Sequence, residues 1–160
     1  MSYQSWNKKN GLRVLMYHKT IDTGPGDLLT VTSQQLEEQF RFFQQEGYNC
    51  VSLQEVISHI STGSPLKEKP LMLTFDDGYK NNRTVLYPLL QKYNLKAVIF
   101  LVPGYIKKAE ANESEYMNIN EIQSMRPDIV EFGFHTFDHK GFNSLSLDEI
   151  EEPVLDRKSV

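Results

Sequence analysis

The chain has 160 residues, with 17 Lys and Arg against 21 Asp and Glu, a net charge of −4 and a mean hydropathy of −0.46. This length suits one domain that buries about 70% of its unfolded surface, so we expect residues 1–160 to form a single domain. The interleaved charges argue against nucleic acid as the main partner. The longest strongly apolar run, residues 97–102, is far shorter than the roughly 20 residues of a membrane span.

A single cysteine, Cys50, excludes an internal disulfide and every cysteine-based zinc or iron–sulfur motif. It lies in the apolar-leaning segment 48–51, which predicts a buried and unreactive thiol. The first twenty residues carry no apolar segment of signal-peptide length ahead of a small-residue cleavage site. The chain as written is therefore expected in the cytoplasm.

Short apolar segments alternate with amphipathic ones along the chain. The first half predicts a strand at 12–17, a helix from Thr32 or Ser33 to Gln45, a strand at 48–51, a short helix with a Ser52/Glu55 capping box, and a surface loop at 61–70. The second half predicts a strand at 71–75, a helix around 84–93 that Pro88 distorts, a strand at 97–102, a helix capped by Asn118 or Asn120 that ends before Pro127, a strand at 129–134, and a helix begun by Ser146 and Glu149.

This alternation defines the fold class. Apolar strands joined through helices are typical of crossover connections between parallel strands. We therefore predict an α/β protein with about five parallel strands, each apolar on both faces.

Polar residues that could carry chemistry follow three of the predicted strands. His18 follows the first, Asp76-Asp77-Gly78 the third, and the fifth leads into His135 and His139. An Asp-Asp-Gly turn alone is ordinary turn chemistry, and His-x-x-x-His alone lacks the Glu of the zinc-protease pattern. A parallel sheet, however, brings the carboxyl ends of its strands together. Two imidazoles and one carboxylate are a common ligand set for Zn²⁺ and other divalent transition metals, so the combination predicts a metal site.

The paired aspartates are explained if their roles differ. One carboxylate binds the cation while its neighbour accepts a proton from water. A bound metal lowers the pKa of water from about 15.7 toward 7, which makes hydroxide available at neutral pH. The predicted chemistry is hydrolysis of an amide or ester.

Two motifs carry a resemblance to a known family. Thr74-Phe75-Asp76-Asp77-Gly78 is similar to the first motif of the polysaccharide deacetylases, and His135-Thr136-x-x-His139 is similar to the second. This family is also called the NodB-homology domain or carbohydrate esterase family 4. The segment Leu15-Met16-Tyr17-His18-Lys19 further resembles the branch that includes poly-N-acetylglucosamine deacetylases. The resemblance runs from about residue 12 to the end of the chain.

The resemblance implies a role for each matching residue. It places one divalent metal, Zn²⁺ first with Co²⁺ and Ni²⁺ as alternatives, on Asp77, His135 and His139, and it makes Asp76 the general base. Residues with supporting or substrate-binding roles would be His18, Thr74, Tyr79 and Thr136. The implied reaction removes acetyl groups from an N-acetylated glycan, and the implied fold is a distorted barrel of about seven strands. Tyr105 and Phe137 are candidates for a sugar groove or for simple packing, and His59 is expected to be exposed.

The sequence departs from the family pattern after His139. The later family motifs, an Arg/Pro segment and a Leu-x-His segment that supplies the general acid, have no counterpart there. We therefore expect a domain truncated at its C-terminal side. A short homologue completed by another chain, and a remnant that binds metal or glycan without turnover, are the alternatives. An incomplete sheet would have an open edge that a homo-oligomer would cover. For the function, the alternatives are a non-catalytic glycan-binding or interaction domain, and a metal-dependent deacetylase of peptidoglycan, xylan esters or small cyclic amides. The resemblance also allows a location in the cell envelope or outside the cell.

Overall fold

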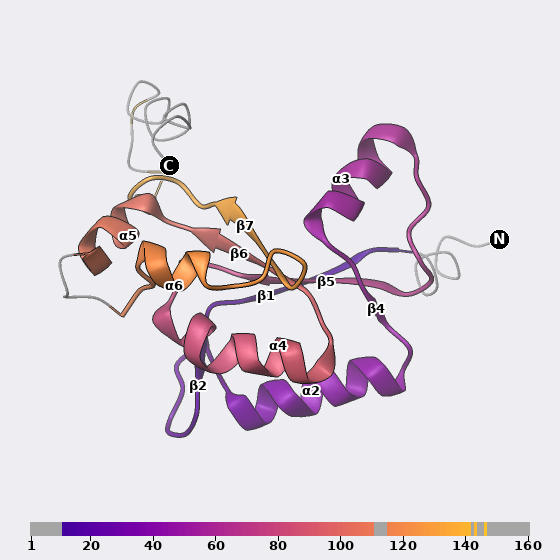
Figure 1. Cartoon of the computed structure of the whole chain (residues 1–160), viewed down its shortest axis with the longest axis horizontal. Helices are drawn as coiled ribbons and strands as arrows, with labels where there is room; N and C mark the ends of the chain where they lie inside the picture. The colour runs from indigo at the N-terminus through magenta and orange to yellow at the C-terminus, as the bar shows by residue number, and fades with distance from the viewer. Residues whose placement is uncertain (1–10, 111–114, 142, 144–145, 147–160) are drawn as a thin grey trace.

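A parallel sheet forms the centre of the protein (Figure 1). The computed structural model describes residues 11–110, 115–141, 143 and 146. The strands of this sheet are β1 (Arg13–Tyr17), β4 (Asn49–Cys50), β5 (Pro70–Phe75), β6 (Ala97–Leu101) and β7 (Val130–Phe134). They lie in the order β1-β5-β6-β7, with β4 beside the start of β5, and every pair is parallel. The predicted fold class and the five predicted strands are confirmed, with ends that differ by at most one residue.

The register of the sheet places the strand ends that matter for function. Tyr17 of β1 pairs with Phe75 of β5, and Phe75 pairs with Ile99 of β6. The last pair between β6 and β7 joins Leu101 to Phe134. All these strands point the same way, so the residues after Tyr17, Phe75 and Phe134 emerge at one edge of the sheet.

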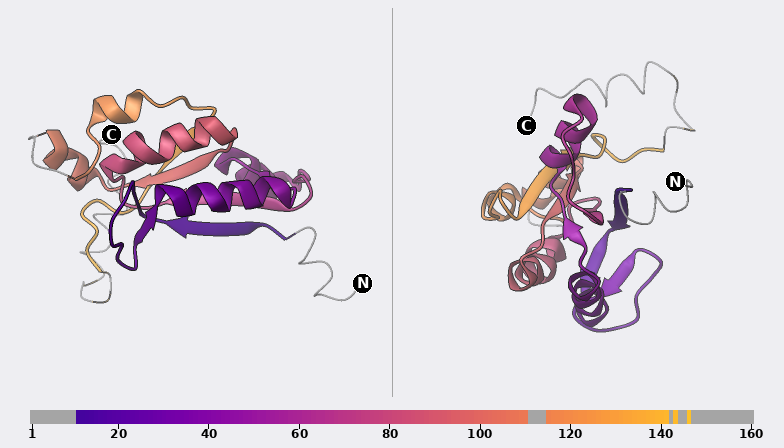
Figure 2. Two further views of the ribbon diagram at one scale, coloured as in Figure 1. Left: turned by 90° about the horizontal axis from the view of Figure 1, so that it is seen from below. Right: turned by 90° about the vertical axis from the view of Figure 1, so that its right-hand side faces the viewer.

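Helices cover both faces of the sheet (Figure 2). They are α2 (Ser33–Gln45), α3 (Leu53–Thr62), the π-helix η1 (Asn82–Leu86), α4 (Tyr87–Tyr93), α5 (Pro103–Glu110) and α6 (Ile119–Gln123). On β5, Leu71, Leu73 and Phe75 pack with α2, α4 and α6 in the main core. Met72 points the other way and packs with Val56 of α3. This alternation follows from the two-residue period of a strand.

The predicted helix starts are largely confirmed. Thr32, Ser52 and Asn118 each form a capping box with the residue three positions on. Each box pairs two backbone N–H groups that the helix itself leaves without a partner. Of the two caps considered for the last of these helices, Asn118 rather than Asn120 is the one used.

The helix predicted around 84–93 is divided. Residues Asn82–Leu86 form the π-helix η1, and α4 begins at Tyr87 with Pro88 in its first turn. A proline has no N–H to donate, so it is tolerated at a helix start, and the wider π turn comes before it. The predicted distortion at Pro88 is thus confirmed as a change of helix type.

Three elements were not predicted. A second, two-stranded parallel sheet joins β2 (Lys19–Ile21) to β3 (Thr30–Thr32), and α5 follows β6. The strand β1 is apolar on both faces but is not covered on both, because Val14 and Met16 are 55% and 66% exposed. The helix predicted from Ser146 and Glu149 lies largely outside the described residues. Among the residues that are described, no helix is long and apolar enough to cross a membrane.

Candidate metal centre

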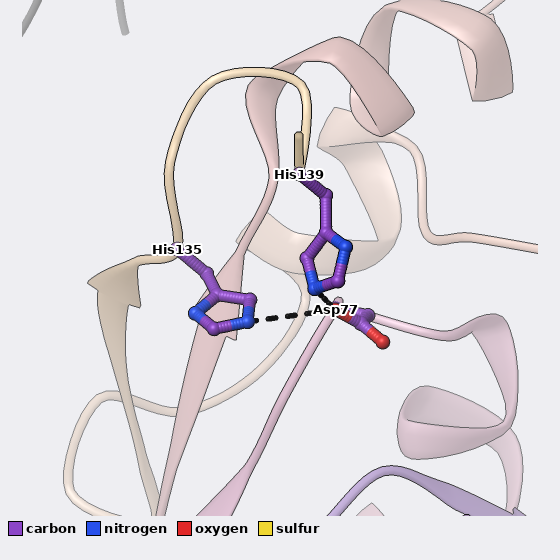
Figure 3. A group of neighbouring side chains, drawn as sticks. All are labelled: Asp77, His135 and His139. Carbon is purple, nitrogen blue, oxygen red and sulfur yellow. Dashed lines mark ion pairs between the residues drawn. The ribbon is translucent and has the colours of Figure 1, made fainter. Parts of the chain in front are cut away.

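Two loops at the carboxyl edge of the sheet bring three predicted ligands together. Asp77 follows β5, and His135 and His139 lie in the loop that follows β7 (Figure 3). The Oδ1 atom of Asp77 lies 3.2 Å from Nε2 of His139 and 3.8 Å from Nε2 of His135. The candidate ligand atoms all lie within 4.8 Å of one another. The structure therefore assembles the set Asp77, His135 and His139 as the sequence predicted.

The Asp77 carboxylate fits a cation at this position. Its Oδ1 atom is buried and has no hydrogen-bond partner among the described residues, although two imidazole nitrogens face it. A buried carboxylate oxygen without a partner is costly, and a bound cation removes that cost. Zinc sites typically combine imidazole and carboxylate ligands at about 2.0–2.2 Å, so small side-chain shifts would close this set around an ion.

Asp76 occupies a different environment from its neighbour. Its Oδ2 atom lies 3.9 Å from Nε2 of His18, and its backbone N–H donates to the carbonyl oxygen of Tyr17. Burial raises the pKa of the Asp76 carboxyl group, while the nearby His135 and His18 act in the opposite direction. His18, whose position was uncertain from the sequence, thus lies at the site and faces the predicted base rather than Asp77.

Both loops use backbone conformations that side chains rarely adopt. The φ angles are +73° at Asp77, +58° at Thr136 and +57° at His139, and Gly78 follows Asp77 at +72°. The φ angle at Gly78 favours glycine, and a Cβ atom there would lie 2.7 Å from Cδ2 of Leu101, so that side chain would have to shift. Such strain persists only where surrounding contacts hold the chain in place.

A neighbouring segment supplies such contacts for the first loop. The N–H of Lys80 donates to the carbonyl of Glu115 at 2.7 Å, and the N–H of Met117 donates to that of Gly78 at 2.9 Å. Between these bonds, the ring of Tyr79 stacks on that of Tyr116 at 4.9 Å. Tyr79 is only 7% exposed, so it supports the loop by packing and offers little surface to a substrate. Tyr116 was missed from the sequence because it belongs to no motif.

The two predicted supporting threonines have different contacts. The Thr136 hydroxyl accepts a hydrogen bond from the N–H of His139 at 3.1 Å, which stabilises the loop that carries both histidines. The Thr74 hydroxyl donates to the carbonyl of Leu15 at 3.3 Å, so it joins β5 to β1 rather than touching a carboxylate. His59 is exposed on α3, as predicted.

Comparison with known proteins identifies the family. The sequence model of the polysaccharide deacetylase family matches residues 63–160. A Bacillus subtilis (strain 168) protein, YxkH, named as a candidate polysaccharide deacetylase, is 27% identical over 93% of this chain and 50% of its own length. The poly-β-1,6-N-acetyl-D-glucosamine N-deacetylase of Escherichia coli (strain K12) is 33% identical over 61% of this chain and 15% of its own length.

A solved structure shows the same arrangement of elements. The Streptococcus pyogenes deacetylase PplD, solved in complex with acetate, matches with a TM-score of 0.76 and 26% identity over 89% of this chain and 65% of that one. The chain thus spans half the length of the B. subtilis relative and a smaller part of the E. coli one. With its two motifs at the carboxyl edge of a parallel sheet and a family match over residues 63–160, this chain belongs to the polysaccharide deacetylase family.

Proposed function

We propose that this protein is a divalent-metal-dependent hydrolase that removes acetyl groups from an N-acetylglucosamine polysaccharide. The observation that carries the proposal is the buried Asp77 Oδ1 atom, which lacks a hydrogen-bond partner and faces two imidazole nitrogens. Asp77, His135 and His139 would hold the metal. When bound, a metal of this kind lowers the pKa of water and polarises a carbonyl group. The donor set favours Zn²⁺, with Co²⁺ and Ni²⁺ as alternatives.

Asp76 is the residue best placed to act as general base. Its carboxyl group lies next to the proposed ligand Asp77 in the chain, and its raised pKa makes it a better proton acceptor near neutral pH. His18 faces Asp76 at 3.9 Å, and its charge, when it is protonated, favours the charged carboxylate. The two aspartates can therefore divide the work, one binding the cation and the other receiving a proton from water.

The substrate class rests on the relatives. The E. coli relative is named for deacetylation of poly-β-1,6-N-acetyl-D-glucosamine, and the PplD structure holds acetate. Both fit a site that would hydrolyse an acetamide. The residues after β5 and β7 lie at the sheet edge, and His139 is 44% exposed, so a polymer could approach from solvent.

The test compares metal binding with acetate release. The 160-residue chain is treated with a chelator, reloaded with Zn²⁺, Co²⁺ or Ni²⁺ and incubated with β-1,6-linked N-acetylglucosamine oligomers. We expect metal-dependent release of acetate, loss of both metal and release in His135→Ala, and a bound metal with release lowered by about a hundredfold or more in Asp76→Asn.

Two outcomes would change the proposal. Full acetate release by Asp76→Asn would remove Asp76 as the base. Metal binding without acetate release from these oligomers, from peptidoglycan or from acetylated xylan would favour a non-catalytic glycan-binding protein. Release from one of the other substrates alone would keep the enzyme and replace the substrate.

A further inference from the structure

The loop that carries both proposed histidine ligands has few internal bonds to hold it. Within residues 135–139, the N–H of His139 donates to the Thr136 hydroxyl, and both of these residues have φ angles near +58°. Two strained positions and one hydrogen bond between residues three apart do not fix the direction of an imidazole ring. Contacts from outside the loop must contribute.

The first turn of α5 supplies a close backbone contact. The N–H of Gly104 donates to the carbonyl of Phe137, in the middle of the loop, at 2.8 Å. A Cβ atom on Gly104 would lie 2.8 Å from that same carbonyl oxygen, which is closer than real Cβ atoms come. Gly104 therefore allows α5 to pack directly against the histidine loop.

The next residue places an aromatic ring beside a proposed ligand. The ring of Tyr105 lies 6.1 Å from the His139 imidazole, at an interplanar angle of 33°. It stacks on Tyr116 at 4.1 Å, and Tyr116 stacks on Tyr79 at 4.9 Å. These separations lie in or just below the usual range for aromatic pairs. Because Tyr79 follows Asp77 and Gly78, the three tyrosines connect the loop of the carboxylate ligand to the loop of the histidine ligands.

We propose that Tyr105, held on the loop by Gly104, is a positioning residue that directs His139 toward Asp77. This inference rests on the proposed metal site. The contact of Tyr105 with His139 would keep the loop after β5 and the loop after β7 close enough to bind one ion. The ring, rather than the hydroxyl group, makes the contact with His139. Tyr105→Phe should therefore keep His139 directed toward Asp77, and Tyr105→Ala should not.

The experiment measures Zn²⁺ affinity by competition with a chromophoric chelator, which needs no enzyme assay. Loss of a group that orients a metal ligand commonly lowers affinity by about 10–100-fold. We expect the dissociation constant to rise by about tenfold or more in Tyr105→Ala and in Gly104→Ala, and to stay within about twofold in Tyr105→Phe. The Co²⁺ absorption spectrum should also change in the first two variants, because a misdirected imidazole alters the coordination.

Tyr48→Ala is the matched control. Tyr48 is also half-buried and packs on Phe42 and Phe43, away from the histidine loop, so its loss should lower stability without changing Zn²⁺ affinity. Wild-type affinity in both Tyr105→Ala and Gly104→Ala would overturn the inference; if one variant does not fold, the other decides. Failure of the wild-type chain to bind Zn²⁺ would instead overturn the proposed metal site.

Discussion

The α2–α4 layer and the edge of the sheet that carries the proposed metal site are held together in opposite ways. In the helix layer, Glu37 of α2 accepts hydrogen bonds from Arg41, from Lys92 and from the Tyr93 hydroxyl. These contacts lie beside a core to which both helices contribute, and α2 begins with a capping box. The loss of any one donor leaves two others on the same oxygen of Glu37, so it should change stability little.

The edge of the sheet relies instead on strained loops. Asp77, Thr136 and His139 have left-handed backbone angles. A few backbone bonds hold the two loops: those of Lys80 and Met117 hold the first, and those of Gly104 and His135 hold the second. We therefore expect substitutions in the helix layer to be tolerated better than substitutions at this edge.

The largest effect is expected from Asp77→Asn, which should lower the affinity for metal without lowering the stability of the fold. Asparagine tolerates the φ angle of +73° and removes the buried charge. Metal affinity should fall by more than the roughly 10–100-fold that follows loss of an outer contact. In the metal-free protein the free energy of unfolding should stay the same or rise by up to about 1 kcal/mol, because a buried negative charge is gone from an oxygen without a hydrogen-bond partner. Urea titration without metal measures this, and a clear loss of stability would contradict it.

Gly78→Ala should lower both the stability of the fold and the affinity for metal. The new methyl group would lie against Leu101, and alanine is strained at a φ angle of +72°. We expect unfolding to become easier by about 2 kcal/mol, with weaker metal binding. Gly63→Ala is the control, because it has a similar φ angle of +73° and open space around its Cβ position. Equal losses in the two variants would show that the contact with Leu101 does not matter.

His18→Gln should change the reaction and leave the metal in place. His18 faces Asp76 and is not one of the three converging ligands. The expected result is a fall in kcat of about 10–100-fold with an unchanged Zn²⁺ dissociation constant. Weakened Zn²⁺ binding in this variant would place His18 among the ligands instead.

The smallest effect is expected in the tolerant helix layer, from Glu37→Gln. Hydrogen bonds from Lys92 and Tyr93 lower the pKa of Glu37 to about 2. A carboxyl group with a lowered pKa stabilises the fold above its unfolded value of about 4.3, and this contribution disappears as the pH falls toward 2. The stability difference between wild type and Glu37→Gln should therefore be small and constant from pH 6 to 8, and it should shrink below about pH 4. A difference that grows on acidification would show that another group is responsible.

The sequence predicted those features that local pattern determines. The continuous apolar runs of β5 and β6, the helix cap at Thr32 and the capping box at Ser52 appear at the expected places. The convergence of the two histidines with the paired aspartates could be predicted because parallel strands release their ends at one edge. The match of both motifs to the family pointed to the same residues.

The features that were missed depend on contacts between distant segments. The strands β2 and β3 are three residues long and mostly polar, so only their pairing with each other identifies them. The helix α5 begins with Pro103 and Gly104, a pair that is typical of a turn. The contact between Tyr105 and His139 follows from how α5 packs, which no motif records.

The stagger between neighbouring strands has a consequence for how such a site can change over evolution. Phe75, the last residue of β5, pairs with Ile99, while β6 continues for two more residues to Leu101 before His135 leaves β7. Two strand residues correspond to about 6.6 Å, so the histidine loop starts further along the sheet than the aspartates and has to fold back to reach them. Insertions between the elements can be absorbed by loops. A single insertion or deletion within β5 would turn each of Asp76 and Asp77 to the face opposite to the one that it now occupies. We therefore expect the site to tolerate a change of side chain within this strand better than a change of its length.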